Sequence, residues 1–301
     1  GYIKRLPTAE YRAQGRGGKG VKAMATREED YVETVFTAST HDSILFFTNL
    51  GKVYVRKGYR IPEAGRSARG QNIVNIIPTD PGEKVSAMIA GRGVTEDNYL
   101  VFVTRNGTVK RTAQSAFKNI RSNGIRALSL DEGDELISVL QTTGEDKILL
   151  ATHDGMAICF AETDARAMGR DAVGVRGIRL REGDYVVGAG IAAEGAAILS
   201  ITENGYGKRT DVGEYSVQNR GGMGLKNYNV TDKTGPVADV VIVTGDEDLL
   251  VISDDGTIIR MDVGSISLLS RSTQGVRVMR LTGDAKVISI APTDKDFSEA
   301  N

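Results

Sequence analysis

The sequence predicts an all-β fold made of six repeated units with four strands in each. Glycine accounts for 36 of the 301 residues and proline for only 6, which indicates many tight turns rather than a disordered segment. Pairs of glycines recur along the whole chain, and no segment of twelve or more residues has the apolar spacing of an amphipathic helix. Turns at this density are expected to separate short strands.

The repeat is defined by two glycines in each unit. They stand at 1, 51, 107, 155, 205 and 256 and, 17 or 19 residues later, at 20, 70, 124, 174, 224 and 275. A period of about 50 residues is typical of propellers and related arrays, and four strands within it match one propeller blade. We therefore expect a single six-bladed, propeller-like domain over 1–301, with units at about 1–40, 41–95, 96–145, 146–193, 194–246 and 247–292 and a polar tail at 293–301.

The first two strands of a unit form a hairpin around the first glycine. In the fourth unit, residues 147–152 form an apolar run, His153-Asp154-Gly155 the turn, and residues 156–160 the return strand. Three other units carry Asn-Gly or Asp-Gly at this turn, and these dipeptides favour primed turns, which need positive φ. We therefore expect a primed turn at this position.

The third and fourth strands follow the second glycine. In the fourth unit an alternating strand covers 175–180, with Ile178 and Leu180 expected to face the core. A Gly-Asp turn and a last apolar run complete the unit. The first unit begins at its turn glycine and so lacks a first strand. Because an unpaired strand edge is a liability, we expect the native chain to continue upstream of Gly1.

Several classes of function and compartment are disfavoured. The single Cys159 cannot form an internal disulfide, and no apolar run suggests secretion or membrane insertion, so we expect a cytoplasmic protein. His41 and His153 have no Cys or His partner at metal spacing, and we expect neither a metal nor a cofactor. No carboxylate pair or Ser/His/Asp set recurs at strand ends, so a propeller enzyme is not indicated.

Charge is segregated within each unit although the net charge is only −1. Cations concentrate between the two glycines, whereas the turn after the following strand is acidic, as at residues 131–135. Because a repeat places equivalent positions on one rim, a basic band can coexist with a near-neutral chain. Such a band fits the backbone of duplex DNA. It is predicted to contain Lys4, Arg5, Arg56, Lys57, Arg60, Arg66, Arg69, Lys110, Arg111, Lys118, Arg121, Lys208, Arg209, Arg220, Arg260, Arg271 and Arg277.

Residues 14–20, Q-G-R-G-G-K-G, indicate a phosphate-binding loop. Four glycines would let a phosphate approach the backbone N–H groups while Arg16 and Lys19 supply positive charge. The stretch is not a nucleotide-hydrolysing P-loop, because Lys19 is followed by Gly20 rather than by Ser or Thr and Ala13 replaces the first motif glycine.

The chain resembles the C-terminal domain of the DNA gyrase A protein over its whole length. The family's gyrase-A box reads Q-R-R-G-G-K-G, and Gly15 is the one position that departs from it, which would remove one phosphate contact. An echo, Q-N-R-G-G-M-G, stands at 218–224. By resemblance, the DNA-binding box consists of Gln14, Gly15, Arg16, Gly17, Gly18, Lys19 and Gly20.

The resemblance implies a six-bladed β-pinwheel whose blades exchange strands and around which duplex DNA bends. It implies no catalysis by this chain alone, because in that family the DNA-cleaving tyrosine lies in a preceding domain and the other gyrase protein hydrolyses ATP. The expected role is wrapping DNA within an ATP-dependent type II topoisomerase. Its expected partners are duplex DNA, the rest of the gyrase A protein and the gyrase B protein. We expect the isolated domain to be monomeric.

Two alternatives stay open. A domain like that of the topoisomerase IV A protein would bind DNA and select its geometry without wrapping it, and Gly15 keeps this possible. A propeller that binds a protein partner would need an exposed apolar or aromatic patch rather than a basic band. A change in the linking number of DNA circles on binding would indicate wrapping.

Overall fold

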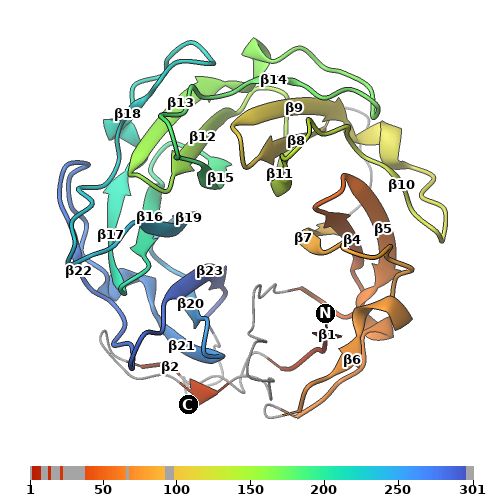
Figure 1. The fold of residues 1–301 in the computed structure, drawn as a ribbon, viewed down its shortest axis with the longest axis horizontal. Coiled ribbons are helices and arrows are strands. Elements are labelled where there is room, and N and C mark those ends of the chain that lie inside the picture. Colours follow the sequence, from red (N-terminus) through yellow and green to blue (C-terminus); the bar gives the residue numbers. More distant parts are fainter. Residues whose placement is uncertain are drawn as a thin grey trace.

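The computed structural model describes residues 2–7, 13–14, 21–22, 38–65, 68–91 and 98–295. In this part of the chain the regular elements are β-strands and single 3₁₀ turns arranged around a common centre (Figure 1). The predicted all-β class is confirmed. None of the helical turns in the described ranges is long and apolar enough to cross a membrane. The 3₁₀ turns are η2 (Gly58–Arg60), η3 (Ile73–Asn75), η4 (Gln114–Phe117), η5 (Glu162–Asp164), η6 (Val212–Glu214) and η7 (Val263–Ser265).

Each complete blade takes three long strands from one unit and a short outer strand from the next. In the fourth unit, β12 (Lys147–Thr152) pairs with β13 (Met156–Ala161) and with β15 (Val186–Ile191). The outer strand, β18 (Leu225–Lys226), pairs with β13 but belongs to the fifth unit. The third strand of every unit is therefore donated to the blade before it.

The other blades repeat this order from the outside inward, and the inner strands face the centre of the array in Figure 1. They are β10 (Ile125–Arg126), β5 (Lys52–Lys57), β4 (Ser43–Thr48) and β7 (Val85–Gly91); β14 (Val175–Arg176), β9 (Thr108–Ala113), β8 (Tyr99–Thr104) and β11 (Leu136–Thr142); β22 (Val276–Arg277), β17 (Tyr206–Asp211), β16 (Ala197–Thr202) and β19 (Val237–Val243); and β21 (Thr257–Asp262), β20 (Asp248–Ser253) and β23 (Val287–Thr293).

The described residues form five blades, whereas six were expected. At the sixth position, β1 (Tyr2–Ile3) pairs with β6 (Gln71–Asn72) in a sheet of two strands. β1 corresponds to the second strand of a unit. Most of the residues after it that would supply the other strands of the first unit lie outside the described part.

The first unit also reaches the last blade. β2 (Ala13–Gln14) lies parallel to β21, and β3 (Val21–Lys22) pairs with β21 in antiparallel register. β3 thus holds in the last blade the place that β22 holds in the blade before it. The two ends of the array are joined through the same strand exchange that joins neighbouring units.

The hairpin turns differ from the predicted primed type. Gly107 has a φ of 86°, but no non-glycine residue in the described part has a positive φ, which a type I′ turn would require at Asn106. Gly107 N donates to Thr104 O at 3.0 Å, so the chain forms a type I turn followed by a glycine bulge. Thr104 Oγ1 then accepts the N–H of Thr108 at 3.1 Å. The same bond explains the recurring Thr at positions 48, 152 and 202.

The first glycine of a unit is also the contact point with the next unit. Gly155 O accepts the N–H groups of Asn227 and Tyr228 at 2.7 and 3.1 Å. A Cβ at Gly155 would lie 2.5 Å from Tyr228 O. Gly51, Gly107 and Gly205 carbonyls accept equivalent pairs of N–H groups from the third, fourth and sixth units. The first glycine therefore recurs because it is the contact point between successive units.

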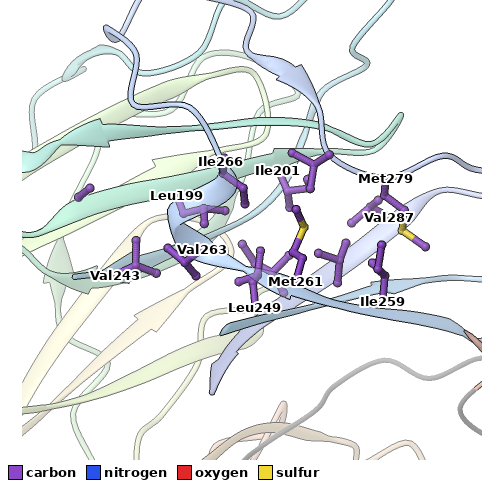
Figure 2. Close-up of a cluster of buried hydrophobic side chains, with 14 residues drawn as sticks. Leu199, Ile201, Val243, Leu249, Ile259, Met261, Val263, Ile266, Met279 and Val287 are labelled. Carbon is purple, nitrogen blue, oxygen red and sulfur yellow. The ribbon is translucent and has the colours of Figure 1, made fainter. Parts of the chain in front are cut away.

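The hydrophobic core lies between adjacent blades rather than inside one sheet. Figure 2 shows Leu199 and Ile201 of β16 packed with Leu249 of β20 and with Ile259 and Met261 of β21, all fully buried. Between the third and fourth units, Ile178 is 1 % exposed and Leu180 packs against the same cluster, so the predicted inward direction of both side chains is confirmed. Each blade completes its core only against a neighbour.

Candidate nucleic-acid interface

Exposed cations line the outer edge of the array. The second residue of each outer strand is Arg126 in β10, Arg176 in β14, Lys226 in β18 and Arg277 in β22, and all four are exposed. These strands follow the circumference in Figure 1. Lys22 holds the same backbone position in β3, and Asn72 is the uncharged member of the series. We call Arg126, Arg176, Lys226 and Arg277 the rim cations.

A second series of arginines reinforces the rim from the loops. Arg170 Nη1 donates to Arg126 O at 3.0 Å, Arg220 Nη1 to Arg176 O at 2.6 Å, and Arg271 Nη1 to Lys226 O at 2.9 Å. Each of these loop arginines belongs to the unit after the rim cation it contacts. At each of three consecutive junctions, a half-buried loop arginine therefore lies next to an exposed rim cation.

Other predicted rim residues are accessible as well. Lys57, Arg60, Lys118 and Arg121 are exposed. Arg69 stacks on the Tyr2 ring at 4.9 Å and is half-buried. Arg277 stacks on Tyr206 at 5.0 Å and donates to its hydroxyl at 2.7 Å, which fixes an otherwise mobile guanidinium.

Two predicted rim lysines lie in the interior instead. Lys110 is 1 % exposed and Lys208 is fully buried. Lys208 Nζ donates to the carbonyls of Ser270, Arg271 and Thr273 at 2.7 to 2.9 Å. Burial lowers the pKa of each lysine to about 8. An ammonium group that is surrounded by carbonyls cannot reach a phosphate, so both lysines are structural.

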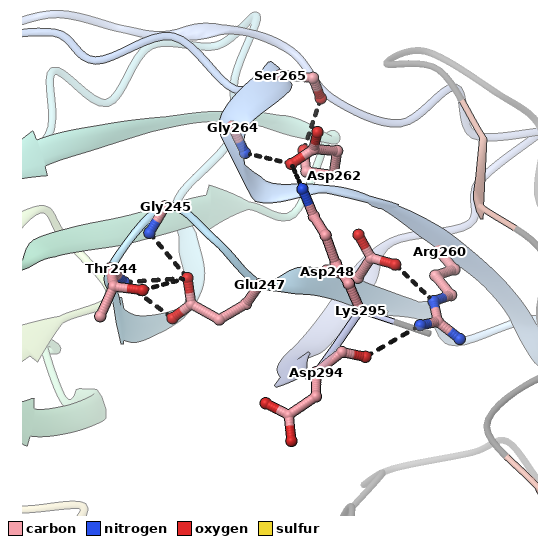
Figure 3. Close-up of polar contacts among 10 residues, drawn as sticks. All are labelled: Thr244, Gly245, Glu247, Asp248, Arg260, Asp262, Gly264, Ser265, Asp294 and Lys295. Carbon is pink, nitrogen blue, oxygen red and sulfur yellow. Dashed lines mark hydrogen bonds and ion pairs between the residues drawn. The ribbon is translucent and has the colours of Figure 1, made fainter. Parts of the chain in front are cut away.

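Arg260 is a third predicted rim residue that the structure places inside. It is 3 % exposed, its Nε donates to Asp248 Oδ2 at 2.9 Å, and its Nη2 donates to Asp294 O at 3.1 Å (Figure 3). Because Arg260 is buried and paired with a carboxylate of its own unit, it is not part of the outer surface.

The side chains of five further predicted cations donate hydrogen bonds to backbone carbonyls. Arg111 is typical: its Nε donates to Ala165 O at 2.8 Å and its Nη1 lies 3.5 Å from buried Glu162. The first carbonyl contact of the others goes from Arg5 to Ile61, from Arg209 to Ile266, from Lys4 to Gly65 and from Arg56 to Ile76. All five are half-buried rather than fully exposed.

The acidic turns serve the hairpins of their own units. Asp134 Oδ1 accepts the N–H of Asn106 at 3.0 Å, and Asp184 Oδ1 accepts that of Asp154 at 3.0 Å. Both carboxylates therefore cap hairpin turns. Ligand atoms of His153, Asp154 and Asp184 lie within 4.8 Å of one another, although His153 has no Cys or His partner at metal spacing in the sequence. Because Asp184 already serves the turn, this cluster carries no assignment.

A family model described as DNA gyrase C-terminal domain, beta-propeller, matches six stretches of the chain, at 1–39, 42–91, 98–143, 146–193, 197–244 and 247–294. The chain belongs to this family. The DNA gyrase A protein of Staphylococcus aureus strain MRSA252 is 48% identical over an alignment of 303 positions that covers 100% of this chain and 34% of that protein. The gyrase A protein of strain NCTC 8325 / PS 47 is 49% identical over an alignment of 301 positions that covers 99% of this chain and 34% of that protein. The chain thus spans about a third of these relatives.

Solved structures agree with this membership of the gyrase C-terminal domain family. A structure of the DNA gyrase A C-terminal domain has a TM-score of 0.88 at 29% identity and covers 97% of this chain and 96% of that one. The C-terminal domain of DNA topoisomerase IV gives 0.75 at 26% identity, with 90% and 85% covered. Both similarity and coverage are higher for the gyrase domain.

The gyrase-A box itself is described only at its edge. Gln14 is seen through its backbone in β2, whereas residues 15–20 and Arg66 lie outside the described residues. Four of the cations at this edge are not among those predicted from the sequence, namely the rim cations Arg126, Arg176 and Lys226 and the loop residue Arg170. Their signal was present, because each rim cation stands two residues after the second glycine of its unit.

Proposed function

We propose that this chain is the DNA-wrapping domain of a DNA gyrase A protein and performs no catalysis by itself. The observation that supports this most directly is the exposed cation on the outer strand of four successive units. A duplex that followed these positions would run along the circumference of the array. The box at 14–20, which precedes β3, would extend this path beyond the last blade.

The chemistry of the rim favours phosphate contacts over base contacts. Arginine and lysine side chains on a convex edge can reach the DNA backbone, and such contacts position a duplex without reading its sequence. Bending 20 to 30 base pairs through 40 to 90° costs on the order of 1 to 6 kcal/mol, which contacts along the curved path must offset. The four rim cations supply such contacts at regular intervals along the edge of the array.

The partners follow from the relatives. Because the chain matches one third of the gyrase A protein, we infer that the rest of that protein and the gyrase B protein complete an ATP-dependent type II topoisomerase. The isolated domain is proposed to be monomeric. The six matched stretches support a six-bladed β-pinwheel as its complete form, with the first unit filling the sixth position.

Wrapping is preferred to the topoisomerase IV alternative because of the box. Six of its seven positions match the gyrase motif, and the similarity to the gyrase domain is higher. A linking-number change in DNA circles that are ligated with the bound domain is the expected result. Binding without any such change would favour selection of DNA geometry instead.

The rim is tested by the salt dependence of duplex binding. Replacing Arg126, Arg176 and Lys226 by Ala should make the slope of log affinity against log salt shallower by about one unit for each contact that is lost. Lys147→Ala is a matched control, because Lys147 is exposed but lies at the start of β12 rather than on an outer strand. An unchanged slope in the triple variant would place the DNA path elsewhere.

A further inference from the structure

The five junctions between successive units, from the first unit to the sixth, are not equivalent, although the repeat is regular. The third and fourth residues after the first glycine are Lys-Arg in the first, third and fifth units. The second unit has Tyr54-Val55 there, and the fourth has Ile158-Cys159. In the first five units the Lys-Arg pair therefore alternates with pairs that carry no charge, and the sixth unit has Ile259-Arg260, whose arginine binds Asp248 and Asp294 O within its own unit.

Each Lys-Arg pair holds the loop of the following unit. Lys110 Nζ donates to Gly169 O and Arg170 O at 3.1 and 3.0 Å, while Arg111 Nε donates to Ala165 O at 2.8 Å. In the same way Lys4 and Arg5 bind carbonyls of residues 61–68, and Lys208 and Arg209 bind carbonyls of residues 266–273. Hydrogen bonds from charged donors are the stronger class, and these donors are buried or half-buried.

The uncharged pairs make no such side-chain bonds in the described residues. The Tyr54 hydroxyl donates within its own unit, to Glu83 at 2.8 Å and Pro78 O at 3.3 Å. Ile158 and Cys159 contribute apolar contacts. Other side chains still bridge these two junctions. Between the second and third units, Arg56 donates to Ser122 O. Between the fourth and fifth units, Arg220 donates to Asp164 O and Arg176 O, and His153 lies beside Glu203. Arginines equivalent to Arg220 cross the Lys-Arg junctions as well.

We infer that the array is built from two-unit blocks, the first with the second unit, the third with the fourth and the fifth with the sixth. Within a block, Lys110 or its equivalent fixes the loop that carries the next loop arginine, since Arg170 O and Arg271 O are themselves acceptors. Between blocks that ammonium is missing. Lys4, Lys110 and Lys208 are thus positioning residues that set where the rim is stiff and where it can flex. This inference does not depend on DNA wrapping.

Hydrogen exchange of the DNA-free chain tests the blocks at matched amides. The pairs 127–128, 177–178, 227–228 and 278–279 all donate to the first-glycine carbonyl of the preceding unit, at 2.7 to 3.3 Å. We expect pairs 177–178 and 278–279 to exchange about tenfold more slowly than the other two, the factor that one charge-assisted hydrogen bond supplies. Equal protection at all four junctions would overturn the inference without any variant being made.

Single variants separate local from global effects. Lys110→Met should speed exchange at 177–178 and leave 278–279 unchanged, and Lys208→Met should do the reverse. Lys147→Met, at an exposed position, should change neither pair. Both buried variants should keep the wild-type salt slope of duplex binding, because neither lysine reaches the surface. Faster exchange at both pairs in each variant, or a slope lower by about one unit, would refute the assignment.

Discussion

Asp239 shows how much one side chain can depend on its neighbours in a ring of blades. Its carboxylate on β19 accepts the N–H of Val240 at 2.8 Å and that of Ile290 in β23 at 3.0 Å. On the other side, a Cβ at Gly188 in β15 would lie 3.0 Å from its Oδ1. Burial between these inner strands raises the pKa of Asp239 to about 7, although the two N–H donors oppose this rise. Compared with the unfolded chain, the folded protein therefore disfavours the charged form of Asp239.

This raised pKa predicts how stability depends on pH. A carboxyl group in the unfolded chain titrates near pH 4, so between about pH 4 and 7 the folded protein holds a proton that the unfolded chain has lost. The contribution of Asp239 to the free energy of unfolding should fall as pH rises through this window and stay constant above it. Asp239→Asn should remove that slope. Urea unfolding of both proteins at several pH values measures it, and identical slopes would contradict the assignment.

At the scale of the element, the hairpin turn and the outer strand carry most of the architecture. The sequence predicts the hairpins, the unit length and the inward direction of Ile178, because these depend on local turn chemistry and alternation. That β18 pairs with the preceding unit was implied only by the family resemblance and not by the strand pattern, since pairing between units leaves no local pattern. Lys110 and Arg126 also look alike in sequence, and only the position of their strands within the blade makes one buried and the other exposed.

Replacing the turn glycine should be far more harmful than positive φ alone explains. Gly155→Ala would place a Cβ 2.5 Å from Tyr228 O at a φ of 92°. Gly183→Ala is a matched control, because its φ is 78° and a Cβ there would have no atom within 4 Å. We expect the control to lose about 1 kcal/mol and Gly155→Ala at least about 3 kcal/mol of unfolding free energy. Equal losses in urea unfolding would show that the junction yields to the added methyl group.

At the scale of the whole molecule, the first unit matters because it contacts both its successor and the last blade. β1 pairs with β6, while β2 and β3 pair with β21. The box at 14–20 begins in β2, at Gln14, and ends directly before β3 in the sequence. A duplex that follows the rim would therefore meet the box only where the path returns to the start of the array.

Removing the box cations should separate binding from wrapping. Arg16→Ala with Lys19→Ala removes two of many positive groups, so duplex affinity should fall modestly. The linking-number change on DNA circles should be lost, because contacts made only in the bent state would no longer offset bending. Lys57→Ala with Arg60→Ala removes the same charge from exposed positions elsewhere and should retain the linking-number change. A box variant that still changes linking number would make Arg16 and Lys19 ordinary phosphate contacts.

Strand donation also determines how such an array can evolve. Every described blade receives its outer strand from the unit that follows it, and the glycines that make this junction recur in each unit. Recombination between two repeats would therefore delete or duplicate a whole unit while leaving each remaining junction chemically complete. The number of units can therefore change without breaking a blade. Selection then has to act on the circumference that the array offers to a partner.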